Sequence, residues 1–350
     1  MEKMNQEGFI GQLAIKVRRE KVDAIDRKIL YLLSLNARLS NTSIANHLKL
    51  SREMVAYRIN RMQNSNILHG FLTLVSLQKT GIHSKSVGIK LHTAIRTDEL
   101  LADLKKLPAV TKITHCGGLY DLHINIMERE LEDCYDTFHN IIFVHGHRFK
   151  LYEIATILGE EFLGLGMLVE NKKEQQYLNK INEKKGSSFQ EAFRKQDRKT
   201  TNRRLDELDE RILKALQHQA RIPLTELSSM TGISVFQLGV RIRQLIHDGI
   251  IKGFIPYLSL AHLGLQFNFV LLNVKKDVER KFSTWVAQHP YIVWKTKYLG
   301  AHNYKLSIFV KNNAHLSDVL NEIYTEFNEG VGNVESLPVF ESPYYKSFMA

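Results

Sequence analysis

One stretch of this chain occurs twice without a gap. Residues 23–71 align with residues 206–254 when 183 is added to each number. A match of this length indicates a tandem duplication, so the chain is expected to hold two copies of one structural unit. The identical pairs include Asp26/Asp209, Ala37/Ala220, Arg38/Arg221, Ser51/Ser234, Arg58/Arg241, Gly70/Gly253 and Phe71/Phe254.

Each copy has the pattern of three short helices. In the first copy, apolar residues recur at helical spacing through Leu33, and a second short segment follows through Leu48. Ser51 is a favoured N-cap residue, and it predicts a third helix that ends near Gln63. The apolar side of this third helix is Val55, Ile59 and Met62, matched by Leu238, Ile242 and Leu245 in the second copy.

The opposite side of the third helix is polar and basic. This pattern indicates a helix-turn-helix, whose third helix enters the DNA major groove. The alternative is an ordinary three-helix bundle with a charged, solvated face. Because Arg58 recurs as Arg241 in a diverged copy, we interpret it as a shared structural or phosphate-binding arginine. The candidate DNA-binding residues are Arg52, Glu53, Tyr57, Arg58, Asn60 and Arg61, with Gln237, Arg241, Arg243 and Gln244 in the second copy.

The order of residues in the repeat is similar to that of a known family. It runs D-x-x-D-x-x-I-L, then A-R, then S-x-x-x-x-x-x-R-I, then I-x-x-G-F. This order resembles the Lrp/AsnC, or feast/famine, transcription factors. The resemblance implies an α+β fold with two winged-helix-type helix-turn-helix domains, each followed by a ferredoxin-like βαββαβ sensing domain. It also implies a sequence-specific DNA-binding transcriptional regulator, modulated by a small effector such as an amino acid bound between sensing domains.

The remaining periodicity is compatible with that order. Helices are expected at 99–107, 131–142, 280–288 and 316–327, and strands at 86–91, 110–115, 122–127, 149–158, 267–274, 292–298 and 334–340. The expected domains are a basic leader (1–22), helix-turn-helix 1 (23–72), sensing domain 1 (73–162), a basic linker (163–204), helix-turn-helix 2 (205–255) and sensing domain 2 (256–350).

A glycine-containing turn stands before the expected third strand of the first sensing domain. The resemblance places small effectors close to this turn, so the candidate effector-binding residues are Gly117, Gly118, Tyr120 and Asp121. Gly permits close approach of a ligand to the backbone, and Asp121 can accept hydrogen bonds from an ammonium group. The alternative is that these residues only form the turn. In the second domain Asn303 replaces Asp121, which predicts weaker binding of a cationic group there.

Metal and enzyme chemistry have little support in the sequence. His115, Cys116 and His123 do not have the spacing of a closed zinc site, so neither a metal nor a cofactor is expected. No paired carboxylates, phosphate loop or activated nucleophile stands out, so the chain is not expected to be an enzyme. Sirohaem decarboxylases are nevertheless similar to this family in fold, also as paired halves. A tetrapyrrole-modifying enzyme of that type is therefore the alternative function.

Charge and cysteine content favour a DNA-binding protein of the cytoplasm. The net charge is +11, and residues 171–204 contain eleven Lys/Arg against four Asp/Glu. This basic linker is either an electrostatic arm along DNA phosphates or a soluble spacer. The two cysteines are too few for a disulfide framework, which indicates a reducing cytoplasm. No apolar run of membrane-spanning length is present, so no membrane partner is expected.

The two copies differ in charge. Residues 23–72 contain seven Lys/Arg and three Asp/Glu, whereas residues 206–255 contain six of each. Val235 and Phe236 also stand where the first copy has Arg52 and Glu53. We therefore expect an intramolecular pseudo-dimer that binds an asymmetric double-stranded DNA site mainly through its first copy. Further assembly into homo-oligomers is a possibility that the family resemblance leaves open.

Overall fold

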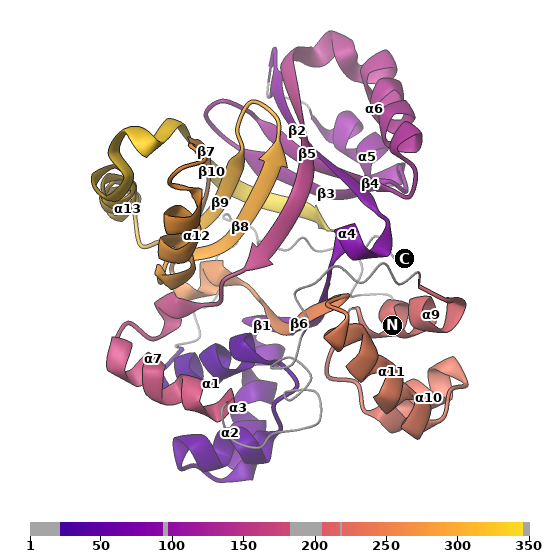
Figure 1. Cartoon of the computed structure of the whole chain (residues 1–350), viewed down its shortest axis with the longest axis vertical. Coiled ribbons are helices and arrows are strands. Elements are labelled where there is room, and N and C mark those ends of the chain that lie inside the picture. Colours follow the sequence, from indigo (N-terminus) through magenta and orange to yellow (C-terminus); the bar gives the residue numbers. More distant parts are fainter. Residues whose placement is uncertain (1–21, 94–96, 183–204, 218, 346–350) are drawn as a thin grey trace. The chain divides into compact units, whose positions relative to one another are not determined.

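The structure is a computed structural model that describes residues 22–93, 97–182, 205–217 and 219–345 (Figure 1). The expected leader and the second half of the basic linker lie outside these residues. The described chain forms two compact units. One unit comprises both helix-turn-helix segments with part of the linker, and the other comprises both sensing domains.

The first helix-turn-helix has the three helices that its sequence predicts. They are α1 (Ala24–Leu35), α2 (Asn41–Leu48) and α3 (Arg52–Asn64). Asp23 and Asp26 form a capping box at the start of α1, and Ser51 accepts a hydrogen bond from the Met54 backbone to cap α3. Asn66 ends the segment with a φ of +56°, the left-handed conformation that Asn tolerates.

The second copy repeats this arrangement. Its helices are α9 (Glu207–Leu216), α10 (Leu224–Thr231) and α11 (Val235–His247). A strand follows the third helix of each copy, β1 (Leu68–Val75) after α3 and β6 (Ile251–Leu258) after α11. These strands pair antiparallel with each other, so the two helix-turn-helix segments share one two-stranded sheet.

The repeated Ala-Arg and Gly-Phe motifs join the two copies by reciprocal contacts. The guanidinium of Arg38 lies 5.4 Å from the ring centre of Phe254, and that of Arg221 lies 5.0 Å from the ring centre of Phe71. Arg38 also donates hydrogen bonds to the carbonyls of Ala220 at 2.6 Å and Ile222 at 3.1 Å. Burial, with the nearby Arg221 charge, lowers the pKa of Arg38 to about 10. The motif residues shared by the copies are therefore those that hold the copies together.

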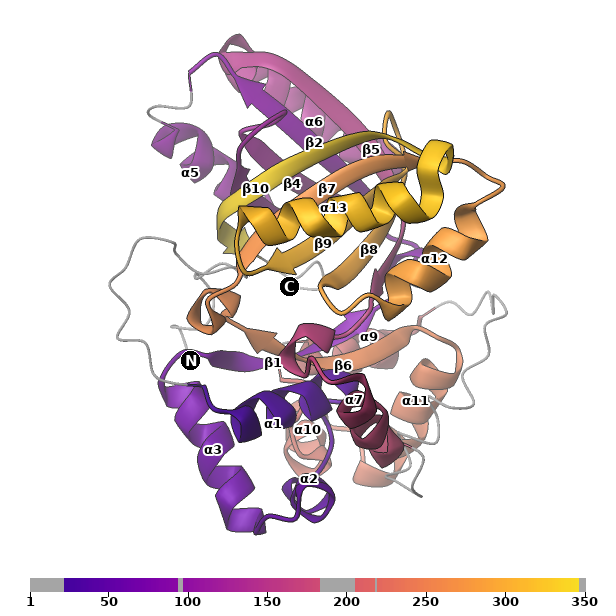
Figure 2. The same cartoon turned by 90° about the vertical axis from the view of Figure 1, so that its left-hand side faces the viewer.

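The first helix of the linker, α7 (Lys172–Asn179), packs on the first helix-turn-helix beside α1 (Figure 2). Tyr177 stacks on His47 with ring centres 4.7 Å apart, and its hydroxyl donates to the His47 carbonyl at 3.0 Å. Tyr31 donates to the Asn179 side chain at 2.9 Å. This part of the linker is a structural element of the first helix-turn-helix segment. The predicted electrostatic arm remains a prediction for residues 183–204.

Each sensing domain has the order βαββαβ. The first contains β2 (His83–Leu91), α5 (Asp98–Lys106), β3 (Val110–Cys116), β4 (Leu122–Glu128), α6 (Leu131–His145) and β5 (Phe149–Phe162). The second contains β7 (Gln266–Val274), α12 (Glu279–Gln288), β8 (Ile292–Leu299), β9 (Tyr304–Val310), α13 (Asn313–Phe327) and β10 (Val331–Tyr345). Short helical turns occur as α4 (Leu77–Thr80), η2 (Gly146–Arg148), η3 (Gly166–Leu168), η4 (Lys180–Asn182), η5 (Leu260–Leu263) and η6 (Asn328–Gly330).

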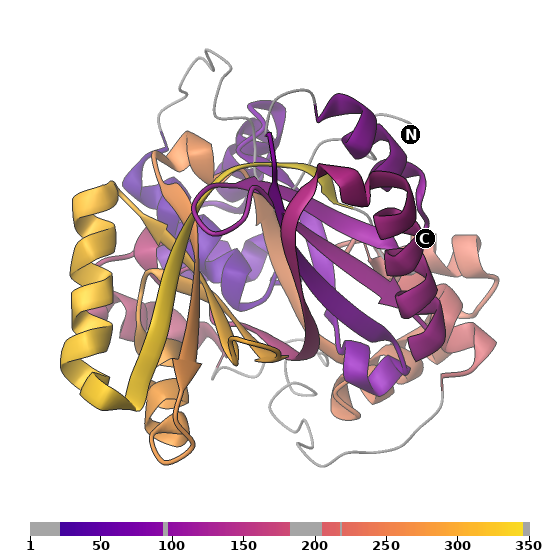
Figure 3. The ribbon, with the colours of Figure 1, turned by 90° about the horizontal axis from the view of Figure 1, so that it is seen from above.

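The eight strands of the two domains close into one barrel in the order β10-β3-β4-β2-β5-β8-β9-β7 (Figure 3). The last strand of each domain crosses into the other domain: β5 pairs with β8 from Thr156 onward, and β10 pairs with β3 from Val339 onward. The helices of the two domains lie on opposite outer sides of the barrel (Figure 3). The α+β fold with paired ferredoxin-like domains is thus present as expected.

Strand periodicity explains the two faces of each sheet. In β4, Leu122, Ile124 and Ile126 belong to the apolar core under α5 and α6, whereas the alternating His123 and Asn125 are buried on the other face. In β9, Tyr304, Leu306 and Ile308 face their own helices in the same way. The alternating Lys305 and Ser307 are buried on the inner face. The space between the two sheets therefore contains polar side chains from both domains, beside apolar ones such as Phe269 and Leu271.

Candidate nucleic-acid interface and effector site

The solvent face of α3 carries four of the candidate DNA-binding side chains. Arg52, Glu53, Tyr57 and Asn60 are exposed, and Tyr57 has 63% of its surface accessible. The buried side is Val55, Ile59 and Met62, as their spacing predicts. An arginine, a phenol and an amide on one exposed face match the side chains that contact phosphates and base edges.

Two further candidates on α3 are held by carboxylates of α1. Arg58 forms ion pairs with Asp23 at 2.7 Å and with Asp26 at 2.9 Å, and Arg61 also pairs with Asp26. The Asp26 side chain is fully buried, so these contacts tie α3 to the start of α1. Burial alone would raise the pKa of Asp23, but the Arg58 hydrogen bond and backbone N–H groups outweigh it and lower that pKa to about 2.

The second copy repeats this ion-pair cluster on α11. Arg241 pairs with Asp206 at 2.6 Å and with the buried Asp209 at 2.9 Å. The hydrogen bonds that Arg241 donates to Asp206 and Asp209 raise its pKa. Arg58 and Arg241 are therefore held by carboxylates in both copies, which fits the structural one of the two roles predicted for them, and phosphate binding stays a prediction.

The solvent face of α11 differs from that of α3. Val235 and Phe236 are exposed, Phe236 with 79% of its surface accessible. Gln237 is exposed, Arg243 is half-buried, and Gln244 is exposed but donates to Asp248 at 2.8 Å. The basic, polar surface of α3 thus has a largely apolar counterpart at the start of α11.

The glycine turn of the first sensing domain is tightly packed. Gly118 has a φ of +87°, which L-residues rarely adopt, and a Cβ at Gly117 would lie 2.9 Å from the Phe340 ring. The carboxylate of Asp121 is held by Lys90 at 2.9 Å and by the Leu91 backbone N–H at 2.9 Å. Asp121 therefore has internal partners that an incoming ammonium group would have to replace.

The matching turn of the second domain keeps the backbone contact without a carboxylate. Asn303 accepts a hydrogen bond from the Val274 backbone N–H at 2.8 Å and donates one to the Val274 carbonyl at 2.8 Å. This geometry shows that a carboxylate is not required to close the turn. The residue at this position can therefore change without loss of the fold.

Tyr120 points from the turn into a small polar cavity between the two sheets. The cavity measures about 20 Å³, and its lining includes Glu153, His123, Tyr298 and His302. Tyr120 donates its hydroxyl proton to Glu153, and burial together with this contact raises its pKa strongly. Such a volume holds about one water molecule in the present conformation.

The polar network continues across the domain interface. His123 Nε2 lies 2.7 Å from Ser86 Oγ, and the Tyr298 hydroxyl donates to the same Ser86 oxygen at 3.2 Å. Burial, with the charges of Lys305 and Lys112, lowers the pKa of His123 well below its ordinary value. His123 is therefore neutral near pH 7.

Two lysines also lie in the barrel interior. The ammonium of Lys305 is 4.4 Å from the ring centre of Phe269, and that of Lys112 is 5.5 Å from the same ring. Burial lowers the pKa of each to about 8. These residues were not among the sequence candidates. The signal was present, since Lys305 is the only charged residue in the apolar strand Tyr304–Val310.

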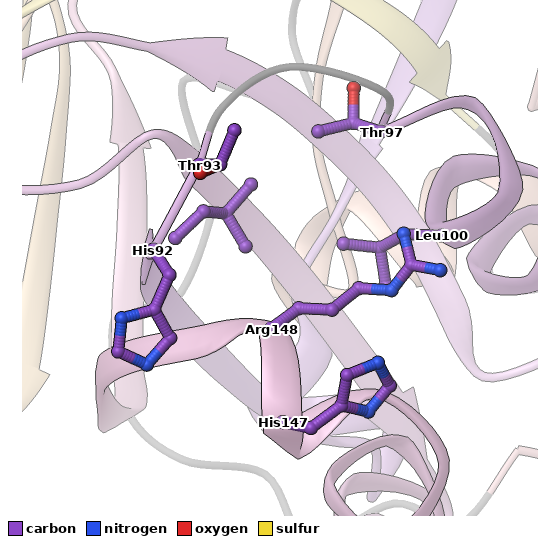
Figure 4. A pocket seen from close by; sticks show the side chains of 7 residues that line it. His92, Thr93, Thr97, Leu100, His147 and Arg148 are labelled. Carbon is purple, nitrogen blue, oxygen red and sulfur yellow. The ribbon is translucent and has the colours of Figure 1, made fainter.

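A second cavity, of about 290 Å³, opens at the end of β2 in the first domain (Figure 4). His92, Thr93, Thr97, His147 and Arg148 surround it, and the Arg148 side chain extends toward Leu100. Arg148 forms an ion pair with Glu99. The cavity shares the end of β2 with the Asp121 turn, because Asp121 binds the Leu91 backbone.

The histidine and cysteine candidates do not gather around one point. His115 pairs with Glu341 at 2.9 Å, His123 bonds to Ser86, and the Cys116 thiol is buried. Within the described residues, no group of three or more His, Cys, Asp or Glu side chains has metal-binding geometry.

Comparison with known proteins identifies the repeated segments. A model of the AsnC-type helix-turn-helix domain matches residues 22–63 and 205–246. The HTH-type transcriptional regulator FL11 of Pyrococcus horikoshii is 32% identical over 120 residues, which cover 34% of this chain and 80% of that protein. The chain belongs to the Lrp/AsnC family of transcriptional regulators. The FL11 protein of Pyrococcus furiosus is 28% identical over the same share of each chain.

Solved structures of a siroheme decarboxylase resemble this Lrp/AsnC chain over almost its whole length. The siroheme decarboxylase NirDL aligns with a TM-score of 0.60 at 12% identity, covering 93% of each chain. At this identity the likeness concerns the fold alone. Among the helices that the structure describes in this Lrp/AsnC protein, none has the length and apolar content to cross a membrane.

Proposed function

We propose that this Lrp/AsnC protein is a non-enzymatic transcriptional regulator that binds an asymmetric DNA site as an intramolecular pseudo-dimer in the cytoplasm. The first helix-turn-helix supplies most base contacts. The observation that carries this proposal is the contrast between the exposed faces of α3 and α11. Arg52 and Tyr57 project from α3, whereas Val235 and Val240 occupy the matched positions of α11.

Arg52 neutralises a phosphate or approaches guanine, and Tyr57 and Asn60 make hydrogen bonds to bases. Glu53 lies at the same exposed end of the helix, where a carboxylate accepts from cytosine N4. Arg58 and Arg61 keep their carboxylate partners and orient α3, with their outer nitrogens turned toward phosphates.

In the second copy, Gln237, Arg243 and Gln244 provide a smaller set of contacts, and Arg241 has the role of Arg58. At the start of α11, the exposed Val235 and Phe236 can contact only the methyl groups of thymine among the groups that bases expose in the major groove. The second copy therefore contributes mainly to the affinity for DNA and to the distance between the two DNA contacts, and it contributes less to recognition of the base sequence.

The DNA contacts are tested by a salt series with matched variants. Arg52→Ala/Tyr57→Ala removes two exposed side chains of α3, and Val235→Ala/Val240→Ala changes the corresponding positions of α11. For wild type we expect affinity for double-stranded DNA to fall steeply with salt, by roughly 0.9 log units per log unit of salt for each phosphate neutralised. The α3 variant should bind more weakly with a slope lower by about one such increment, and the α11 variant should keep the wild-type slope.

Equal losses in both variants would contradict the assignment of base contacts to the first copy. Absence of salt-dependent DNA binding by the wild type would contradict the proposed function as a whole. Both variants alter exposed positions, so thermal unfolding serves as the control that each remains folded.

We further propose that a small effector such as an amino acid binds between the sensing domains at Tyr120, beside Gly117, Gly118 and Asp121. Tyr120 contributes to both the turn and the polar network that reaches the second domain through Tyr298. Because the cavity is now about 20 Å³, a ligand of amino-acid size has to separate the two sheets to enter. Binding would therefore favour a different packing of the domains.

The effector proposal is tested by thermal unfolding with a panel of free amino acids. A binding amino acid should raise Tm by mass action, and Tyr120→Phe, which lacks the hydroxyl bonded to Glu153, should reduce the rise. A panel without any shift would contradict an amino-acid effector, and a shift unchanged in Tyr120→Phe would place the effector elsewhere. The cavity of Figure 4 is the next site to examine, because it opens beside the same turn.

The alternative function is a tetrapyrrole-modifying enzyme, which the shared fold with NirDL favours. The regulator proposal predicts that the purified protein neither retains a tetrapyrrole nor binds an added iron porphyrin. A Soret band that stays with the protein through gel filtration would favour the enzyme instead.

A further inference from the structure

The outward face of α6 carries an aromatic stripe that the matching helix lacks. Leu131, Tyr135, His139 and Phe143 are spaced four residues apart, so they share one side of the helix. All four are exposed, and Phe143 has 84% of its surface accessible. The stripe spans about 18 Å along the helix.

The second sensing domain provides an internal comparison. α6 and α13 have the same length, and both lie on the outer side of their own sheet (Figure 3). The residues of α13 at the four matched positions are Asn313, Ser317, Asn321 and Thr325. The fold therefore does not require apolar residues on this face. The exposed Tyr324 of α13 lies at the position of Ile142 in α6, outside the four matched positions. A row of exposed aromatic side chains on one of two homologous helices marks an interaction surface.

The same side of the first domain contains a cavity of about 510 Å³. It lies beside the first half of α6, where Leu131, Tyr135 and Phe138 line it together with Ile154 of β5. Phe143 lies at the other end of the helix. The lining of the cavity is mostly apolar and also includes Lys85, Glu132 and Asp136. A projecting aromatic ring and a mostly apolar cavity thus occur at opposite ends of one surface, an arrangement that is complementary to itself under a two-fold rotation.

The charges follow the same arrangement. Glu132, Asp133 and Asp136 are exposed at the cavity end of α6, and His147 and Lys150 are exposed just after its other end. An antiparallel copy of the helix would place the acidic end of each chain opposite the basic end of its partner.

We propose that this surface binds a second copy of the same chain, with α6 packed antiparallel on α6 about a two-fold axis near His139. Phe143 of each chain then faces Tyr135 of the other and enters the cavity beside it. Because α13 is polar at every matched position, the assembly closes at two chains and does not extend into a ring. The proposal is independent of which DNA or effector the protein binds.

Analytical ultracentrifugation of the full-length protein tests this assembly. Wild type should sediment as a species of twice 40.4 kDa, and Tyr135→Ser/Phe143→Thr, which installs the residues of α13, should raise the dimer Kd at least tenfold. The reverse transfer, Ser317→Tyr/Thr325→Phe, gives the second domain a stripe and should produce species larger than a dimer. Unfolding curves like those of wild type show that the exchanges leave each chain folded.

Cross-linking locates the contact. The proposed axis places residue 139 opposite itself, so His139→Cys should be joined between chains by a short bis-maleimide, while Asn321→Cys on α13 should not. The native Cys116 and Cys134 are buried and do not compete.

Three outcomes would overturn the proposal: a wild type that stays monomeric at every concentration, a Tyr135→Ser/Phe143→Thr variant that dimerises as wild type does, or equal cross-linking at positions 139 and 321. A fourth result would also overturn it: a full-length chain that stays monomeric and a chain lacking residues 1–21 that dimerises would together assign the stripe to that segment.

Discussion

Replacing Lys305 with methionine is expected to stabilise the protein near neutral pH. Lys305 is 4% exposed in the barrel interior, and its ammonium group lies over the Phe269 ring. Methionine has a similar length and flexibility without the charge, so it can fill the same space. The change removes a charged group from an environment that disfavours it.

The expected size follows from the pKa. Burial lowers the pKa of Lys305 from 10.5 to about 8, and each unit corresponds to about 1.4 kcal/mol, so burial of the charge costs roughly 3 kcal/mol. Loss of the cation–π contact with Phe269 offsets about 1 kcal/mol of this. We therefore expect a net gain of about 2 kcal/mol in the free energy of unfolding.

The gain should depend on pH in a defined window. The folded-state pKa is lower than the unfolded one, so between about pH 8 and 10.5 the unfolded chain binds more protons and wild-type stability rises with pH. Below pH 8 the cost is fully present in wild type. The advantage of Lys305→Met should thus be largest below pH 8, and it should disappear as the pH approaches 10.5.

Urea unfolding of both proteins across this pH range measures the difference. Lys105→Met, at an exposed position of α5, is the control and should change stability by less than about 0.5 kcal/mol at every pH. A Lys305→Met variant less stable than wild type at pH 7, or a gain that does not vary with pH, would refute the reasoning. The first result would mean that the buried ammonium group stabilises the domain pair. The second would mean that the gain has a cause other than removal of the charge.

Three further changes test other parts of the molecule. Asp26→Asn should destabilise the protein by about 3 kcal/mol in urea unfolding, because it removes the buried carboxylate that Arg58 and Arg61 share. Gly118→Ala should lower the free energy of unfolding by about 1–2 kcal/mol, because Gly118 has a φ of +87°. Gly81 also has a positive φ but no neighbouring atom within 4 Å of a Cβ, so Gly81→Ala measures the effect of the backbone conformation without crowding. His123→Gln should weaken the loss of stability on acidification below about pH 6.5, because the buried imidazole has a lowered pKa and resists protonation; an unchanged pH profile would contradict that role.

Local signals predicted the helix-turn-helix segments well. The N-cap at Ser51 and the apolar spacing of Val55, Ile59 and Met62 act within α3 itself, so residues near in sequence determine the element. The predicted end near Gln63 is one residue short of the observed end at Asn64.

The strands were predicted less completely because partners distant in sequence extend them. The expected strand 149–158 continues to Phe162 in β5, and its added residues pair with β8 of the other domain. The expected strand 334–340 is likewise part of the longer β10, whose last residues pair with β3. The strand β9 (Tyr304–Val310) is absent from the predicted elements. Strand pairing across domains leaves no periodic signal in either partner alone.

The roles of individual site residues depended on three-dimensional neighbours. The recurrence of Arg38 as Arg221 indicated importance, but their contacts with Phe254 and Phe71 arise only when the two copies pair. Recurrence did support the structural interpretation of Arg58, which the ion pair with Asp26 explains. By contrast, the partners of Asp121 come from β2, thirty residues earlier, and no spacing rule identifies them.

Fusion of two halves in one chain permits differences that a symmetric dimer does not allow. His123 and Lys305 occupy corresponding positions of β4 and β9, both buried between the sheets. A homodimer of the second half would place two copies of Lys305 in that interior, where two desolvated ammonium groups would repel each other. In the fused chain the position matched to Lys305 holds an imidazole that is neutral near pH 7, so this position adds no further charge to those of Lys305 and Lys112. The same freedom to diverge applies to two other matched pairs. Arg52 of α3 corresponds to Val235 of α11, and Phe143 of α6 corresponds to Thr325 of α13. Each of these differences gives one half a surface that the other half lacks. The two unlike halves stay together because they pair within one chain.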